Sequence, residues 1–124
     1  MNKYDEMSDL EVNKKLAAYI GLLVANEDMG AYSHDYRERY PSTIWVAKQE
    51  FGNQVEAWEQ VNYCLTANDM WPIIVDNNIS ITHYPSGDAM TFIQGGGFMK
   101  FKHESKNALR SAAITFLMMK DMTE

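Results

Sequence analysis

The sequence predicts an α+β fold, in which an antiparallel sheet of about four to five strands packs with about three helices in the manner of an α-β-α sandwich. Apolar residues recur at helical spacing near both ends of the chain, whereas short segments rich in β-branched and aromatic residues fill the middle. The 124 residues are 46% hydrophobic and 23% charged, ordinary values for a folded protein. Chain length predicts a single domain over residues 1–124.

The first helix is expected from about Asp9 to Asn26. Ser8 and Glu11 have the spacing of a capping box, in which each side chain accepts a hydrogen bond from the other residue's backbone N–H. Asn13 is expected on the solvent side, and Gly30 is the expected stop signal. The apolar residues at helical spacing are Leu16, Ile20, Leu23 and Val24.

The next part of the chain is expected to form a loop and two strands. Residues 31–41 are polar and aromatic without a clear period, which is typical of a surface loop. Residues 42–49 are rich in β-forming residues and end before Gly52-Asn53. Residues 54–64 fit either a helical face or strand alternation, and we favour a strand that ends near Leu65.

A second helix is expected to start at Asn68 or Asp69, because that start places Pro72 in the first turn, where its missing N–H costs little. The helix should run to Asp76 and break at Asn77-Asn78. Three strands are expected after it, over residues 79–84, 89–94 and 98–103, separated by turns at residues 85–88 and 95–97.

The last helix is expected from about Asn107 to Met122. Its apolar residues extend beyond a single stripe, which indicates a helix that is buried on most sides. Two interpretations account for this excess: a central core helix, or a helix that contacts a second subunit in a homo-oligomer.

Composition excludes several classes of function. The formal net charge is −6, the wrong sign for a general nucleic-acid coat. The single Cys64 excludes an internal disulfide, and no apolar run is long enough to span a membrane. Acidic residues near the start argue against a signal peptide. We therefore expect a cytoplasmic protein that binds neither nucleic acid nor membrane.

The sequence gives no case for an enzyme, a metal or a cofactor. The three histidines, His34, His83 and His103, lack the spacing of a metal site. Cys64 lies between Tyr63 and Leu65, the setting of a small buried hydrophobe rather than of a nucleophile. The glycines at 95–97 lack the Lys-Ser/Thr of a phosphate-binding loop.

One cluster of basic residues predicts a ligand site. Lys100, Lys102, Lys106 and Arg110 fall within eleven positions that contain a single acid, Glu104. Period-two alternation is expected to place Lys100 and Lys102 on one strand face, leading into a helix N-terminus that favours anions. The alternative interpretation is a solvated edge strand.

Four further residues complete this candidate phosphate site. Ser105 and Asn107 would add a hydroxyl and an amide, and Arg110 a guanidinium fork. Trp71 and Tyr84 would stack on a base. In the alternative interpretation Asn107 is only a helix cap, Arg110 pairs with an acid, and the aromatic residues are core or interface packing.

Three segments resemble the NinX-like family of small tailed-phage proteins: residues 61–74, Ile79-Ser-Ile, and residues 107–119, with the opening residues 7–14 also similar. They cover about half of the chain, and residues 27–59 look like a family-variable insertion. Relatives often have proline where this chain has Ala108. The resemblance implies a phage accessory protein acting in the infected bacterium.

The order of the elements is also similar to that of phage α-β-α proteins that sequester nucleotide signals of host defence. We therefore expect a non-catalytic, oligomeric binding module for a small phosphorylated host molecule. The alternative is an inhibitor or adaptor that acts on a host protein, with Tyr32 to Tyr40 as a contact loop.

Overall fold

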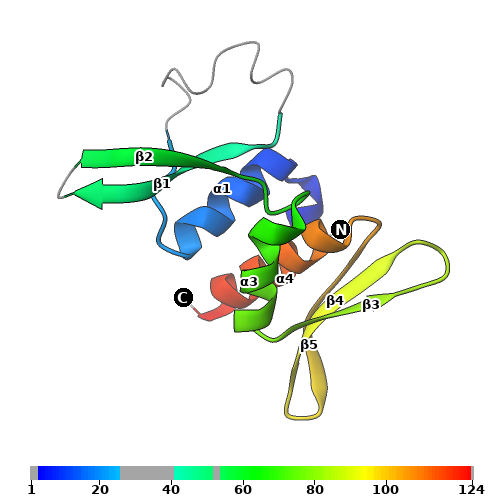
Figure 1. The fold of residues 1–124 in the computed structure, drawn as a ribbon. Helices are drawn as coiled ribbons and strands as arrows, with labels where there is room; N and C mark the ends of the chain where they lie inside the picture. The colour runs from blue at the N-terminus through cyan, green and yellow to red at the C-terminus, as the bar shows by residue number, and fades with distance from the viewer. Residues whose placement is uncertain (1–2, 26–40, 52–53, 124) are drawn as a thin grey trace. The chain divides into compact units, whose positions relative to one another are not determined.

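The computed structural model describes residues 3–25, 41–51 and 54–123 (Figure 1). The chain divides into two compact units, Met1–Asn62 and Tyr63–Glu124, and each is described by itself. The α+β class is confirmed, since the described residues form three α-helices and five strands in two antiparallel sheets. None of the described helices has the length and apolar character needed to cross a membrane.

The first unit consists of a helix and a hairpin. A short 3₁₀ helix, η1 (Lys3–Glu6), precedes α1 (Asp9–Tyr19), and β1 (Ile44–Phe51) pairs antiparallel with β2 (Gln54–Val61). Both strands were expected, although β2 ends four residues before Leu65. The predicted loop and its tyrosines at 32, 36 and 40 lie largely outside the described residues.

The helix α1 ends at Tyr19, seven residues earlier than the sequence predicts. Gly21 takes a φ of +83°, so that its N–H reaches the carbonyl of Ala18 at 3.1 Å and the N–H of Leu22 reaches that of Ala17 at 3.0 Å. This pair of bonds is a Schellman motif, which glycine favours because it lacks a Cβ. The stop signal is therefore Gly21, and the prediction of Gly30 is wrong.

Because the helix ends there, the apolar residues that follow it do not extend its buried face. Ile20 and Leu23 are exposed. Val24 instead forms a bridge with Val46, and the N–H of Ala25 donates to the carbonyl of Trp45 at 2.9 Å. The segment after α1 thus lies along the free edge of β1.

Asn13 is fully buried, contrary to the predicted solvent position. Its Nδ2 donates to the carbonyl of Ser42 at 2.7 Å and to Oδ1 of Asn62 at 2.9 Å, and Nδ2 of Asn62 donates to Oγ of Ser42 at 2.8 Å. These bonds attach the middle of α1 to the open end of the hairpin, where β1 begins and β2 ends. Partners inside the core explain why a polar residue is tolerated there.

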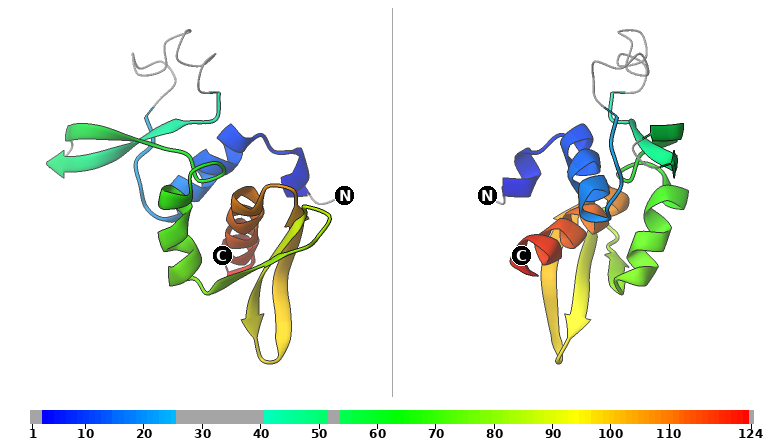
Figure 2. Two further views of the ribbon diagram at one scale, coloured as in Figure 1. Left: turned by 45° about the vertical axis from the view of Figure 1, so that its right-hand side comes forward. Right: turned by 90° about the vertical axis from the view of Figure 1, so that its left-hand side faces the viewer.

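The second unit is a three-stranded sheet with two helices. After α3 (Ala67–Asp76) come β3 (Ile79–His83), β4 (Ala89–Gly95) and β5 (Phe98–Ser105), paired antiparallel in the order β3-β4-β5, and then α4 (Ala108–Thr123). The helix α4 packs against all three strands and α3 (Figure 2). These elements match the predicted order, with the last strand two residues longer than expected.

The helix α3 starts at Ala67, one residue before the predicted start, and Thr66 at its N-cap makes no side-chain capping bond. Pro72 consequently lies in the second turn instead of the first. Its missing N–H leaves the carbonyl of Asn68 without the usual helical donor, and the exposure of both residues allows water to take that place.

The middle of α4 is buried on every side, because all seven residues from Ser111 to Leu117 are at most 1% exposed. A single chain is therefore enough to bury this part of the helix. Of the two interpretations of its apolar surface, the structure favours the central core helix, and association through α4 stays a prediction.

Candidate functional site

Three buried hydroxyl groups join α4 to the sheet, a feature that the sequence analysis missed. Oγ1 of Thr91 on β4 lies 3.0 Å from Oγ of Ser111 and 2.7 Å from Oγ1 of Thr115, both on α4. All three residues are fully buried. The only sequence signal is the spacing of Ser111 and Thr115 by one helical turn within an apolar stripe.

These hydroxyl groups satisfy carbonyls at an irregularity of β5. Between the pairs Thr91–His103 and Ile93–Lys100, β4 has one residue and β5 has two, which defines a β-bulge. Phe101, in the bulge, takes a φ of +57°. Thr115 donates to its carbonyl at 2.8 Å, and Ser111 donates to that of His103 at 2.8 Å. The network therefore has a structural role at the bulge.

His103 belongs to this network and not to the exposed basic residues. It is 7% exposed, and its Nδ1 lies 2.9 Å from Oγ of Ser111. Which of these two atoms donates depends on the tautomer of the imidazole ring. The bond attaches the side chain of His103 on β5 to α4, so this histidine is part of the packing between the strand and the helix.

The bulge also overturns the prediction that Lys100 and Lys102 share a face. Residues directly opposite each other across a sheet lie on the same face, which places Lys100 with Ile93 and His103 with Thr91. Ile93 and Thr91 share one face of β4, so Lys100 shares a face with His103. Lys102 follows the bulge, is adjacent to His103 and therefore lies on the opposite face.

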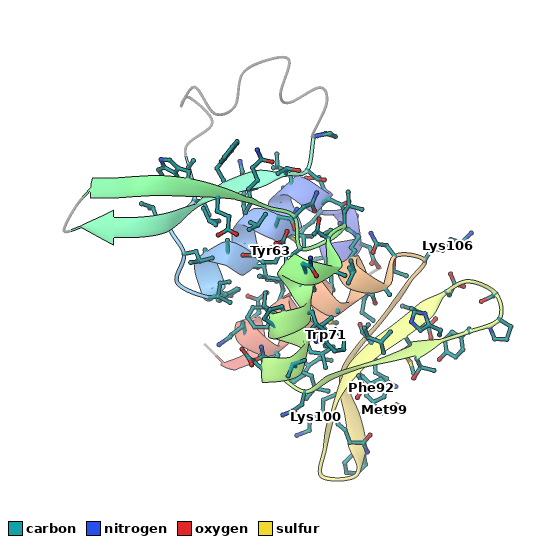
Figure 3. The ribbon with its side chains drawn as sticks, in the orientation of Figure 1. Tyr63, Trp71, Phe92, Met99, Lys100 and Lys106 are labelled. Carbon is teal, nitrogen blue, oxygen red and sulfur yellow. The ribbon has the colours of Figure 1, made fainter. Side chains whose placement is uncertain are left out.

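The predicted site residues are divided between two ends of the sheet. Ala89 pairs with Ser105 at one end, beside Tyr84 and Lys106, whereas Lys100 pairs with Ile93 five residues back along β5, roughly 16 Å away at strand rise. Figure 3 shows this separation between Lys100 and Lys106. The structure therefore groups Lys106, Ser105, Asn107 and Arg110, and leaves Lys100 apart from them.

At the start of α4, Asn107 acts as the helix cap. Its Oδ1 accepts from the N–H of Arg110 at 3.1 Å, and its Nδ2 donates to the carbonyl of Cys64 at 2.8 Å. Oγ of Ser105 accepts from the N–H of Asn107 at 3.0 Å. The side chains of Ser105 and Asn107, which were expected to bind an anion, thus form hydrogen bonds with the backbone at the start of α4 and with Cys64. Lys102 and Lys106 are exposed, and Arg110 is half-buried.

The two aromatic candidates lie on different elements. The hydroxyl of Tyr84 donates to Sδ of Met90 at 3.6 Å, which holds its ring against β4. Trp71 lies on α3 and is 59% exposed (Figure 3). Tyr84 is thus engaged by β4, whereas Trp71 presents its ring on the outside of α3.

Trp71 belongs to an exposed surface on α3, which we name the α3 stripe. Four of its residues lie on the helix at helical spacing and are exposed, and the exposed Leu65 lies two residues before the helix: Asn68, Trp71, Pro72, Val75 and Leu65. The opposite side of the helix is apolar as well, with Met70, Ile73 and Ile74 buried. The sequence analysis treated Trp71 as an isolated stacking residue and missed this surface, although the spacing of the stripe is visible in the sequence.

The second unit thus presents two candidate binding surfaces, the α3 stripe and the basic residues Lys102, Lys106 and Arg110 around the start of α4. Comparison with protein-family models, with curated proteins and with solved structures finds no match for this chain.

Proposed function

We propose that this chain is a non-catalytic binding module that docks on a partner protein through the α3 stripe. The observation that carries the proposal is the exposure of large apolar side chains on α3 and just before it: Trp71 at 59% and Val75 at 53% lie one turn apart on the helix, and Leu65 at 60% lies two residues before it. Exposed apolar surface of this kind marks sites of protein association, because water is released when a partner covers it.

Trp71 is the expected centre of this interface. Tryptophan is among the residues that contribute most to protein–protein binding, often about 2 kcal/mol or more when truncated. Val75 lies one helical turn from it and Pro72 follows it in the chain, and both would exclude water from the contact. In the phage setting that the resemblance implies, the partner would be a host enzyme or a defence complex, and the chain would act as its inhibitor or adaptor.

The test is quantitative affinity purification of the tagged full chain from bacterial cells, with chemical crosslinking before lysis. We expect a protein that copurifies at a fixed ratio and that is lost with Trp71→Gln combined with Val75→Gln. Met122→Gln is the matched control, because Met122 is also exposed and lies on α4. Unfolding curves of all three proteins show whether the fold is retained.

Two outcomes contradict the proposal. One is that no protein copurifies at a fixed ratio. The other is that the double variant and the Met122→Gln control retain the partner equally, which would place the interface elsewhere.

A second candidate function is the capture of a small phosphorylated molecule, such as a nucleotide signal of host defence. It is favoured by Lys106, which lies two residues before α4, and by Arg110 in the first turn of the helix, with Lys102 four residues before Lys106. The N–H groups of Ala108 and Leu109 in that turn have no helical acceptor, and the helix dipole favours an anion beside them.

Native mass spectrometry of the full chain, mixed with cyclic di- and trinucleotides and cyclic ADP-ribose isomers, tests this candidate and reports the subunit count. Capture requires one bound nucleotide per subunit or per subunit pair. Binding must be lost in Lys106→Ala with Arg110→Ala and retained in Lys14→Ala. A chain that takes up no nucleotide removes this candidate.

A further inference from the structure

The β4–β5 hairpin has an outer half that projects away from the helices of its unit (Figures 1 and 2). We name this part, residues 93–100, the finger. Its turn is made by Gly96 and Gly97, with φ values of +60° and +82°, and is followed by two exposed apolar residues. Phe98 is 72% exposed and Met99 is 45% exposed. Phe98 pairs with Gly95, so its ring has no side chain opposite it on β4.

The finger is built on a fixed base. The bulge at Phe101 separates it from the inner half of the hairpin, which is bonded to α4 through Thr91 and the carbonyls of Phe101 and His103. A bulge bends its strand and increases the local twist. The direction of the finger is therefore set by buried hydrogen bonds, which lowers the entropy cost of docking its tip.

The charge of this hairpin is opposite to that of the chain. Residues 89–103 contain Lys100 and Lys102 and no acid, although the net charge of the chain is −6. The ammonium group of Lys100 lies 3.6 Å from the place where a Cβ of Gly95 would be, so it occupies space that Gly95 leaves open. Because Gly95 pairs with Phe98, this positive charge lies beside the apolar tip.

We propose that the finger inserts Phe98 and Met99 into an apolar pocket on a partner protein, and that carboxylates at the rim of the pocket pair with Lys100. The inference rests on the proposed function in that it requires a protein partner, but it assigns a different contact surface. Burial of the exposed phenylalanine side chain would remove a large apolar surface from water, which favours docking. A carboxylate rim would complement the lysine and orient the finger.

Charge argues for a pocket rather than for an extended anionic surface. A membrane leaflet or a nucleic acid would repel the net negative chain over a large area. A single pocket has to complement only the tip of the finger, where the local charge is positive. A lipid surface is therefore an outcome of the test that would overturn the proposal. A second copy of the chain is another, because the proposal assigns the pocket to a different protein.

The test is photocrosslinking in bacterial cells that produce the full chain with a benzophenone amino acid in place of Phe98. Ser86, in the exposed turn between β3 and β4, is the control position. We expect a crosslink from position 98 to an apolar residue of another protein that has Asp or Glu beside it, as located by mass spectrometry. Position 86 should not give this crosslink.

The charge requirement is tested by adding Lys100→Glu to the labelled chain, with Lys14→Glu on α1 as the matched control. Reversal of Lys100 should lower the yield of the crosslink about tenfold, the factor that corresponds to 1.4 kcal/mol, and reversal of Lys14 should leave it unchanged. Equal yields in the two variants would overturn the carboxylate rim.

A crosslink to phospholipid, to a second copy of the chain or to no molecule would overturn the finger as a docking element for a partner protein. This failure is distinguishable from a failure of the proposed function. If the α3 stripe variant still loses its partner while position 98 gives no crosslink to a protein, only the finger is excluded.

Discussion

The hydroxyl of Thr115 donates a hydrogen bond of 2.8 Å to the carbonyl of Phe101, the residue at which β5 takes a positive φ. A phenylalanine in this conformation is strained, by about 1–2 kcal/mol relative to the right-handed regions. The conformation is maintained because its carbonyl has a fixed donor on α4. This bond therefore couples a position on α4 to the direction of the finger.

We predict that Thr115→Val lowers the free energy of unfolding by about 1–3 kcal/mol, the cost of leaving a buried polar group without a partner. Valine has nearly the same shape, so the loss would come from the hydroxyl and not from a cavity. Urea denaturation of the full chain measures it. Thr82→Val, at an exposed position of β3, is the control. An equal effect of the two substitutions would contradict the structural role of Thr115.

In the first unit, Asn13→Leu is expected to lower the free energy of unfolding by about 2–3 kcal/mol, because it removes the donor to Ser42 and the partner of Asn62 together. A double-mutant cycle with Asn62→Leu measures the coupling. We expect an interaction energy of at least about 0.5 kcal/mol, as is usual for residues in one hydrogen-bond network. Additive effects would show that the two amides do not act together.

The start of α1 was predictable because its signal is local. Ser8 and Glu11 form the expected capping box, with distances of 3.1 and 3.2 Å. Its end was not predicted, because apolar residues continue at helical spacing beyond Gly21 and favoured a longer helix. The burial of Asn13 depends on Ser42 and Asn62, which are 29 and 49 residues away along the chain. The spacing of apolar residues within α1 does not reveal hydrogen-bond partners that lie so far away along the chain.

In the second unit too, local signals were predictable and a feature without a local signal was not. The order of the strands and helices from residue 67 onward follows from turn residues and periodicity, and the structure has that order. The positive φ in the bulge is taken by Phe101 and not by a glycine, so the sequence gives no signal for the bulge. The extra residue shifts the alternation of side chains, so that residues before and after the bulge no longer follow one pattern of faces. The expectation that Lys100 and Lys102 share a face failed for this reason.

Substitutions of Gly21 test the end of α1. Among the described residues, no atom beyond the two chain neighbours of Gly21 lies within 4 Å of the place where a Cβ would be, so the expected cost of a side chain there is conformational. Gly21→Ala should lower the free energy of unfolding by about 1–2 kcal/mol. Gly21→Asn should have a smaller effect, because asparagine tolerates a positive φ better than alanine does. Thermal unfolding of both variants checks the order, and equal effects would indicate a cause other than φ.

The two sides of α3 should respond differently to truncation, and this difference separates binding from folding. Trp71→Gln is expected to change the free energy of unfolding by less than about 0.5 kcal/mol, as is usual for exposed positions. Ile74→Ala should lower it by about 2–4 kcal/mol, because Ile74 is 4% exposed and its truncation leaves a cavity. Urea denaturation of the full chain measures both changes. A loss of stability in Trp71→Gln as large as that in Ile74→Ala would mean that Trp71 is part of the core. The α3 stripe would then not be a docking surface.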